Sequence, residues 1–151
     1  PESRRFYPKG SLASHILGFV NIDNNGLEGI EQKYNRYLAV NQERISVQRD
    51  AKGNVLSEGT NREIRGDSLV LTIDEGLQYI AEKNIDEAMS RWQSSSATII
   101  MMNPYNGEVL AMASRPSYDP NNPAEANPQQ RRNRAITDLY EPGSTFKIVN
   151  A

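Results

Sequence analysis

Apolar and polar positions in the first third of the chain predict short elements separated by loops. Residues 1–26 are rich in Pro, Gly and Asn, which favours loops around one apolar stretch at residues 15–20. An amphipathic helix pattern follows at i, i+4, i+7 and i+8, formed by Ile30, Tyr34, Tyr37 and Leu38. Alternation at residues 44–49 then predicts a half-buried strand. Turn residues at 50–54 predict a hairpin that returns through residues 55–56.

The middle of the chain predicts a strand that leads directly into the longest helix. Leu69, Leu71 and Ile73 occupy every second position, as residues on one face of a strand do. Asp74 then has the side chain of a good helix N-cap. A broad apolar face predicts a helix from there to about Ser94, and its members are Leu77, Ile80, Ala81, Ile85, Ala88, Met89 and Trp92.

The pattern after this helix predicts a hairpin and then a long connection. Residues 97–102 form an apolar run that is consistent with a strand buried on both faces. Asn106 and Gly107 predict a turn, after which residues 108–113 return as an antiparallel partner. Four prolines between residues 115 and 130 exclude a regular helix, so we expect an extended connection there.

Composition narrows the classes of partner and site. The net charge is −2, and the one basic cluster, Arg131-Arg132-Asn133-Arg134, is short, which argues against nucleic acid as a partner. We expect this cluster to be a solvated loop or to pair within its domain. There is no cysteine, so disulfides and cysteine-based metal sites are excluded. No stretch approaches the roughly 18 apolar residues of a membrane span. The start at Pro1 indicates a boundary within a longer protein or a cleavage site.

Three polar features in the N-terminal part favour structural roles. His15 is the only histidine, so we expect a packed or hydrogen-bonded residue rather than a metal ligand or catalyst. Residues 23–26, Asp-Asn-Asn-Gly, depart from the calcium-loop template and predict a turn. Glu28 and Glu31 are three residues apart, which is common on helix faces, and we assign them a structural role.

The strongest candidate chemistry lies in residues 140–147, Tyr-Glu-Pro-Gly-Ser-Thr-Phe-Lys. A helix beginning near Ser144 would bring Ser144 and Lys147 onto one face, one turn apart. Pro142 and Gly143 suit such a beginning. The backbone N–H of Ser144 would then be free to stabilise an oxyanion. Lys147 would act as a base in its neutral form, which burial or a neighbouring cation favours. Ser-x-x-Lys alone has only two fixed residues, and many such pairs are simply exposed on helices.

The surrounding sequence resembles the class B penicillin-binding proteins, which are peptidoglycan D,D-transpeptidases. Residues 141–147 are similar to the acylation motif of that family. The likeness extends in the family's order over nearly the whole chain. Residues 71–78, 103–116 and 133–135 resemble parts of the catalytic domain, and residues 5–10, His15 and 26–31 resemble the non-catalytic pedestal. Residues 18–21 and 27–31 are more similar to the septal (division) type than to the elongation type.

The resemblance implies an α+β fold in two incomplete domains. Residues 1–73 would be a pedestal of the dimerisation type, with strands and a short helix. Residues 74–151 would begin the transpeptidase domain with a long helix, an antiparallel hairpin and the start of the catalytic helix. In that family Ser144 would be the acyl-enzyme nucleophile, Lys147 the general base and the Ser144 backbone N–H an oxyanion donor. No metal or organic cofactor is implied.

The resemblance also implies partners and a location. The substrates would be peptidoglycan stem peptides ending in D-Ala-D-Ala, and β-lactam antibiotics would acylate the same serine. Cell-wall synthesis and division proteins would be further partners. The parent protein would work at the extracytoplasmic (periplasmic) face of the bacterial cytoplasmic membrane, held by a single N-terminal anchor that is absent from this chain.

Two other interpretations stay open. The family completes its site with a Ser-x-Asn triplet and a Lys-Thr-Gly or Lys-Ser-Gly strand, and neither follows Ser144 here, so we expect the isolated chain to be inactive. The chain by itself would then be a non-catalytic scaffold or an interaction module for division partners. A β-lactamase or β-lactam sensor shares Ser-x-x-Lys but lacks a pedestal like residues 1–73. Labelling with a fluorescent penicillin separates an acylating protein from a scaffold.

Overall fold

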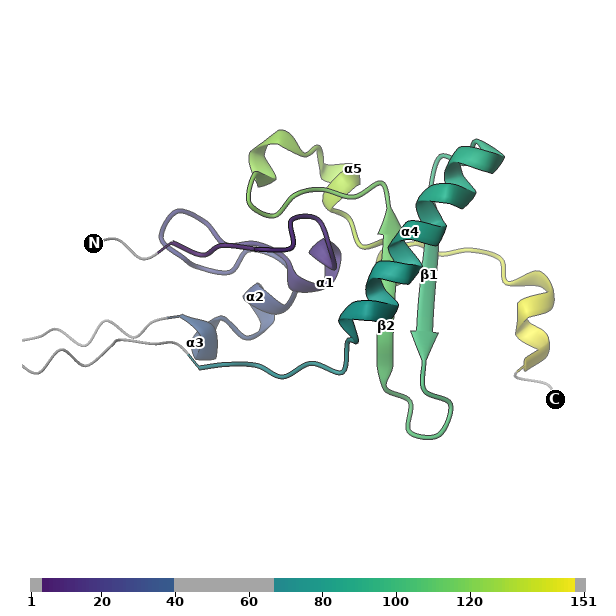
Figure 1. The fold of residues 1–151 in the computed structure, drawn as a ribbon, viewed down its shortest axis with the longest axis horizontal. Coiled ribbons are helices and arrows are strands. Elements are labelled where there is room, and N and C mark those ends of the chain that lie inside the picture. Colours follow the sequence, from purple (N-terminus) through teal and green to yellow (C-terminus); the bar gives the residue numbers. More distant parts are fainter. Residues whose placement is uncertain (1–3, 40–66, 149–151) are drawn as a thin grey trace, which may run out of the picture.

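The computed structural model describes residues 4–39 and 67–148, and these form an α+β fold (Figure 1). The strand and hairpin predicted at residues 44–56 lie outside the described residues. In chain order the elements are α1 (Ser14–Leu17), α2 (Gly29–Lys33), α3 (Asn35–Leu38), α4 (Glu75–Trp92), β1 (Ala97–Met102), β2 (Val109–Arg115), η1 (Pro123–Glu125), α5 (Pro128–Arg131), α6 (Arg134–Thr137) and η2 (Gly143–Ile148).

The predicted antiparallel hairpin is confirmed, and α4 covers one of its faces. β1 and β2 pair with Ile99 opposite Ala113 and Met101 opposite Ala111. Ala81 of α4 is buried against Ala111 and Ala113, so the contact is made largely by small side chains. Small residues allow the helix and the sheet to approach closely. Gly107, at φ +78°, adopts the left-handed backbone that the predicted turn requires.

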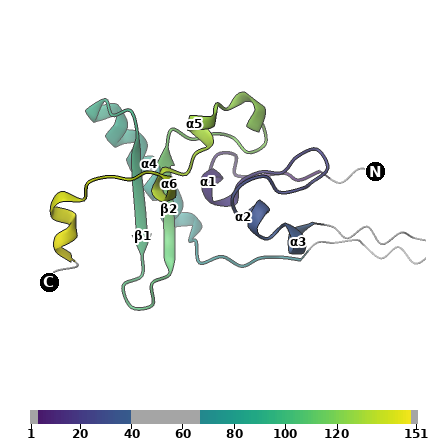
Figure 2. The same ribbon diagram turned by 180° about the vertical axis from the view of Figure 1, so that it is seen from behind.

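The prediction that β1 is buried on both faces is wrong for the described structure. Burial alternates along the strand, and Ile100 and Met102 remain 46% and 56% exposed. The physical reason is that α4 covers only the face that carries Ile99 and Met101. On the other side, α6 lies against the strands and covers only part of their surface (Figure 2).

Helix α4 begins as predicted, but its buried face differs from the predicted one. The Leu77 N–H donates to Asp74 Oδ1 at 2.8 Å, which confirms the N-cap. Ala81 and Ile85 are buried as expected, whereas Ile80 and Trp92 are 52% and 72% exposed and Ala88 is also exposed. The last turns of α4 project beyond the hairpin (Figure 1), and Ala88 and Trp92 are exposed there.

The segment before α4 was expected to be a strand, and that expectation is wrong. Residues 67–73 are extended without a strand ladder, although burial alternates as predicted and Val70 is 99% exposed. Two bonds hold the segment's end beside the start of β2. The Thr72 hydroxyl donates to the Val109 carbonyl at 2.7 Å, and the Asp74 N–H donates to the Leu110 carbonyl at 2.8 Å.

The single helix predicted around residues 30–38 is instead two short helices. α2 ends at Lys33 and α3 begins at Asn35, with Tyr34 between them in a non-helical conformation. Tyr34 and Tyr37 are 36% and 40% exposed, so this face is not a core face in the described chain. Only Ile30 of the predicted apolar set lines a groove described below.

The small core of the N-terminal part is completed from the other end of the chain. Tyr7 and Phe19 pack with Tyr118, which belongs to the connection after β2. The turn predicted at residues 23–26 is present, with Asn24 at φ +60°. The connection after β2 contains only short helical turns, η1 and α5, as its prolines predicted. The chain therefore folds back, and residues 118–131 lie against residues 4–39.

Candidate active site

The predicted nucleophile and base lie on the last described helix. η2 carries Ser144 and Lys147 in 3₁₀ geometry rather than in the expected α-helix. Residues three apart nearly eclipse one another in a 3₁₀-helix, so both side chains leave the same side of η2. Gly143 precedes Ser144 with φ +51°, a left-handed conformation for which glycine is suited. The spacing of the motif thus has its expected consequence, through a tighter helix.

The Ser144 and Lys147 side chains are both exposed, and the site around them is open. Among residues 67–148, neither side chain has a hydrogen bond or an ion pair to the other or to a third residue. η2 stands apart from the hairpin and α4 in both ribbon views (Figures 1 and 2). Phe146 and Tyr140 beside it are 51% and 76% exposed. The described chain therefore supplies the two reacting groups on an exposed helix.

The segment that leads to this helix is held by ion pairs. Asp138 accepts from Arg134 at 3.0 Å and also pairs with Arg132. Thr137 donates its hydroxyl to the same carboxylate. Desolvation by itself would raise the pKa of Asp138. The hydrogen bonds from Thr137 and Arg134 outweigh it, so the pKa of Asp138 is lowered. Arg132 and Arg134 of the basic cluster thus pair locally, as one of the two expectations had it, whereas Arg131 lies 3.9 Å from Glu28 of the N-terminal part.

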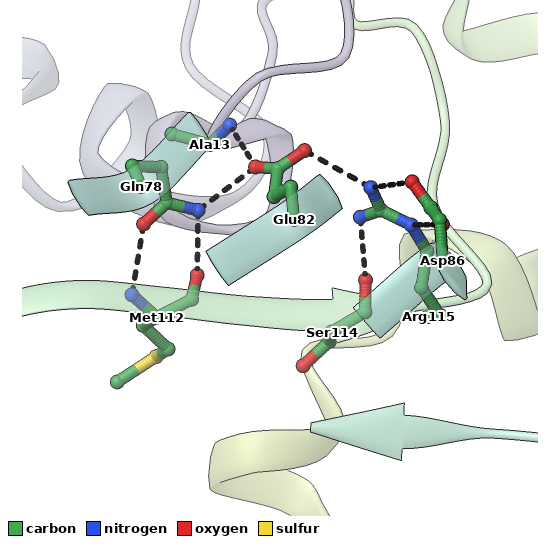
Figure 3. Close-up of polar contacts among 7 residues, drawn as sticks. All are labelled: Ala13, Gln78, Glu82, Asp86, Met112, Ser114 and Arg115. Atoms are coloured by element: carbon green, nitrogen blue, oxygen red, sulfur yellow. Dashed lines mark hydrogen bonds and ion pairs between the residues drawn. The ribbon is translucent and has the colours of Figure 1, made fainter. Parts of the chain in front are cut away.

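A buried polar network lies between α4, β2 and the loop before α1 (Figure 3). Gln78, 1% exposed, binds the backbone of Met112 twice: it accepts from the N–H at 2.8 Å and donates to the carbonyl at 3.0 Å. Gln78 also donates to Glu82 Oε1 at 2.8 Å. The same oxygen accepts the Ala13 N–H at 2.8 Å. One carboxylate thus joins the N-terminal part to α4.

Arg115 closes the other side of this network. It donates to Asp86 at 2.6 and 2.8 Å and to Glu82 at 3.2 Å. The Asp86 hydrogen bond, opposed by desolvation, raises the pKa of Arg115. Sequence reasoning missed these residues because it followed apolar positions. The available signal was the polar series Gln78, Glu82 and Asp86, which recurs every fourth residue on α4.

His15, Glu28 and Glu31 make packing, hydrogen-bond or ion-pair contacts, as expected of residues with structural roles. His15 Nε2 lies 2.8 Å from the Gln130 carbonyl oxygen, and its ring meets the edge of Tyr118 at 5.6 Å between centroids. Burial lowers the pKa of His15. Glu31 is 8% exposed and pairs with Arg5 at 3.0 Å, while Glu28 lies 3.9 Å from Arg131.

A mostly apolar groove of about 390 Å³ lies between the N-terminal part and β2; its lining includes His15, Ile30, Ile73, Met112 and Ile136. Within residues 4–39 and 67–148, no three His, Asp or Glu side chains gather as a metal site needs. In the same ranges, no helix has the length and apolar character to cross a membrane.

Comparison with known proteins identifies two domains in the chain. The penicillin binding protein transpeptidase domain matches residues 97–151, and the penicillin-binding protein dimerisation domain matches residues 1–71. Peptidoglycan D,D-transpeptidase FtsI of Escherichia coli (strain K12) is 37% identical over 147 residues, which is 97% of this chain and 25% of that protein. Stage V sporulation protein D of Bacillus subtilis (strain 168) is 38% identical over 152 residues, 98% of this chain and 24% of that protein.

A solved structure matches the same extent. Penicillin binding protein 3 from Mycobacterium tuberculosis, in its apo form, superposes with a TM-score of 0.75 at 27% identity, covering 97% of this chain and 30% of that one. Its complex with aztreonam matches equally well. The chain spans about a quarter of the length of the curated relatives that it matches.

Proposed function

This chain belongs to the class B penicillin-binding proteins, and from that premise we propose that the whole protein is a peptidoglycan D,D-transpeptidase. The observation that carries the proposal is the Ser144–Lys147 pair, at helical spacing within the residues that the transpeptidase domain matches. Relatives named as peptidoglycan D,D-transpeptidases are 36–39% identical over 97–98% of this chain, which supports it.

In the proposed reaction, Ser144 Oγ attacks the carbonyl carbon between the two terminal D-alanines of a stem peptide. Lys147 takes the hydroxyl proton, so it must be neutral at that moment. The Ser144 backbone N–H donates to the oxyanion, and one such donor is worth about 2.7–4 kcal/mol. Collapse expels D-alanine and leaves an ester on Ser144. An amine of a second stem peptide then attacks that ester, forms the cross-link and frees Ser144.

β-Lactams are proposed to acylate the same oxygen. Attack of Ser144 Oγ on the lactam carbonyl opens the ring, and the leaving nitrogen stays attached to the acyl group. The adduct therefore remains in the site. That a relative of known structure was solved with the β-lactam aztreonam supports this part of the proposal.

The organisation of the parent protein is proposed from the same resemblance. We place the boundary between a pedestal at residues 1–73 and a transpeptidase part that begins at residue 74. The packing of α4 on the β1–β2 hairpin supports grouping α4 with the second part. We further propose the septal (division) type, with division proteins as partners, at the extracytoplasmic face of the bacterial cytoplasmic membrane. A single N-terminal anchor outside this chain would hold it there.

For the 151 residues by themselves, we propose a non-catalytic scaffold. Ser144 and Lys147 are exposed on a helix that stands apart from the remaining described chain, which supports this interpretation. A β-lactamase or sensor is less well supported, because residues 1–71 match a dimerisation domain.

Labelling with a fluorescent penicillin tests the proposal. The full-length protein should label, and Ser144→Ala should abolish the signal, while the exposed Ser95→Ala should label normally. Persistent labelling of Ser144→Ala would move the nucleophile elsewhere and refute the assignment. For the 151-residue chain, intact mass after incubation with benzylpenicillin should show no adduct, and a penicilloyl adduct would refute the scaffold interpretation.

A further inference from the structure

Three consecutive residues of the N-terminal part contact three separate segments of the C-terminal part. The Ala13 N–H donates to Glu82 of α4 at 2.8 Å (Figure 3). The Ser14 carbonyl accepts the Tyr118 hydroxyl at 3.2 Å. His15 Nε2 lies 2.8 Å from the Gln130 carbonyl oxygen of α5. The turn formed by Ala13, Ser14 and His15 is therefore bonded to α4, to Tyr118 in the connection after β2, and to α5.

The backbone at this turn is held in an uncommon conformation. Ala13 has φ +56° and ψ +22°, in the left-handed region that residues with a Cβ atom rarely adopt. Local strain of this kind persists where surrounding contacts determine it, and it points to a functional constraint. Here Ser14 is 1% exposed and Tyr118 is 5% exposed, so the contacts around the strained residue are buried.

His15 contacts a segment, residues 127–138, that is held together by its own hydrogen bonds and ion pairs. A carbonyl only accepts, so the His15 Nε2–H is the donor to Gln130. Gln130 and Asn127 form a reciprocal capping box, with bonds of 3.0 and 2.9 Å. Beyond it, Arg132 and Arg134 both bind Asp138. Residues 127–138 are thus one hydrogen-bonded block.

This block precedes the nucleophile directly, because Ser144 follows Asp138 by six residues. We propose that His15 is a positioning residue for Ser144. Its bond to the Gln130 carbonyl holds residues 127–138 against the N-terminal part and so sets where the chain enters the Ser144 helix. His15 does not contact the reacting atoms. The inference rests on the proposed function, because its consequence is the rate at which Ser144 is acylated.

Two substitutions at His15 separate the hydrogen bond from the packing. His15→Phe keeps an aromatic ring against Tyr118, at the place of the present 5.6 Å edge contact, but removes the donor. His15→Gln replaces the ring with an amide whose N–H₂ lies at about the reach of Nε2, so it can donate to Gln130. Ile85→Val serves as a control, because it loosens the buried core of α4 without touching the three contacts.

The experiment is the second-order rate of acylation of the full-length protein by a fluorescent penicillin. We expect His15→Phe to slow acylation about tenfold, the effect of one lost hydrogen bond, and His15→Gln to stay within about twofold of the unsubstituted protein. Ile85→Val should acylate at the normal rate despite a lower melting temperature. An unchanged rate for His15→Phe, or equal losses in both His15 variants, would overturn the inference.

A second readout does not depend on activity. Hydrogen exchange at residues 127–138 should become faster in His15→Phe and stay normal in His15→Gln. If the unsubstituted protein does not label at all, the proposed function fails, and exchange still decides whether His15 holds this block. Unchanged exchange in His15→Phe would refute the positioning role by itself.

Discussion

Replacement of Glu82 by Ala removes the carboxylate that joins the N-terminal part to α4. Glu82 is 7% exposed and accepts from Ala13, Gln78 and Arg115. Two of these donors keep other partners after the change. Gln78 still donates to the Met112 carbonyl, and Arg115 still binds Asp86. The Ala13 N–H is the donor that loses the acceptor it has in the described structure.

The expected loss of stability in Glu82→Ala follows from these hydrogen-bond partners. A hydrogen bond to a charged group contributes about 1.5–3 kcal/mol, and a buried donor left unpaired costs about 1–3 kcal/mol. Relief of carboxylate desolvation offsets part of this loss. We expect Glu82→Ala to destabilise the junction by about 3 kcal/mol. Asp86→Ala is the matched control: its side chain binds the same Arg115 but is 58% exposed, so we expect less than about 1 kcal/mol.

Hydrogen exchange followed by mass spectrometry measures the effect where it occurs. In the full-length protein, peptides covering residues 8–17 report the opening of the Ala13 contact. A loss of about 3 kcal/mol corresponds to exchange roughly a hundredfold faster in Glu82→Ala. Asp86→Ala should change it by less than about fivefold. Equal effects of the two variants, or a change below about threefold in Glu82→Ala, would refute the reasoning from burial.

Two further predictions concern Gly18 and His15. Gly18→Ala would put a Cβ 1.9 Å from the Glu28 carbonyl oxygen, so we expect a loss above about 3 kcal/mol in unfolding free energy by denaturation. Gly107→Ala, also at positive φ but with open space around it, should cost about 1 kcal/mol, and similar losses would contradict the clash argument. His15 has a lowered pKa in the folded state through burial and Arg115, against Glu82 and the carbonyls of Gln130 and Pro116. As pH falls below about 6.5, the unfolded state therefore binds a proton before the folded state does, and the folding stability decreases. His15→Gln should lack this decrease. If the pH dependence of stability is the same in both proteins, His15 does not cause it.

Features with local causes were predictable from the sequence. The Asp74 cap depends on a side chain that reaches an N–H three residues away. The hairpin turn depends on the conformational freedom of Gly107. The common side of Ser144 and Lys147 depends only on helical spacing, and it survives the change from an α-helix to a 3₁₀-helix.

Burial was predicted less well, because it depends on what covers each face. Ile80, Trp92 and Ile100 are apolar but exposed, since no described element lies over them. Gln78 and Glu82 are polar but buried, because Met112 and Ala13 satisfy their hydrogen-bonding groups. An apolar pattern identifies a strand or helix, but it does not identify the partner of a polar residue.

By itself, the sequence determined the main elements with local signals and the pair of residues that defines the candidate chemistry, Ser144 and Lys147. Only the tertiary structure decided how the two ends of the chain meet. His15 and Gln130 are 115 residues apart in sequence, and Ser14 and Tyr118 are 104 apart. Contacts at such separations leave no period in the sequence, since they arise when the chain folds back and buried polar groups must find partners.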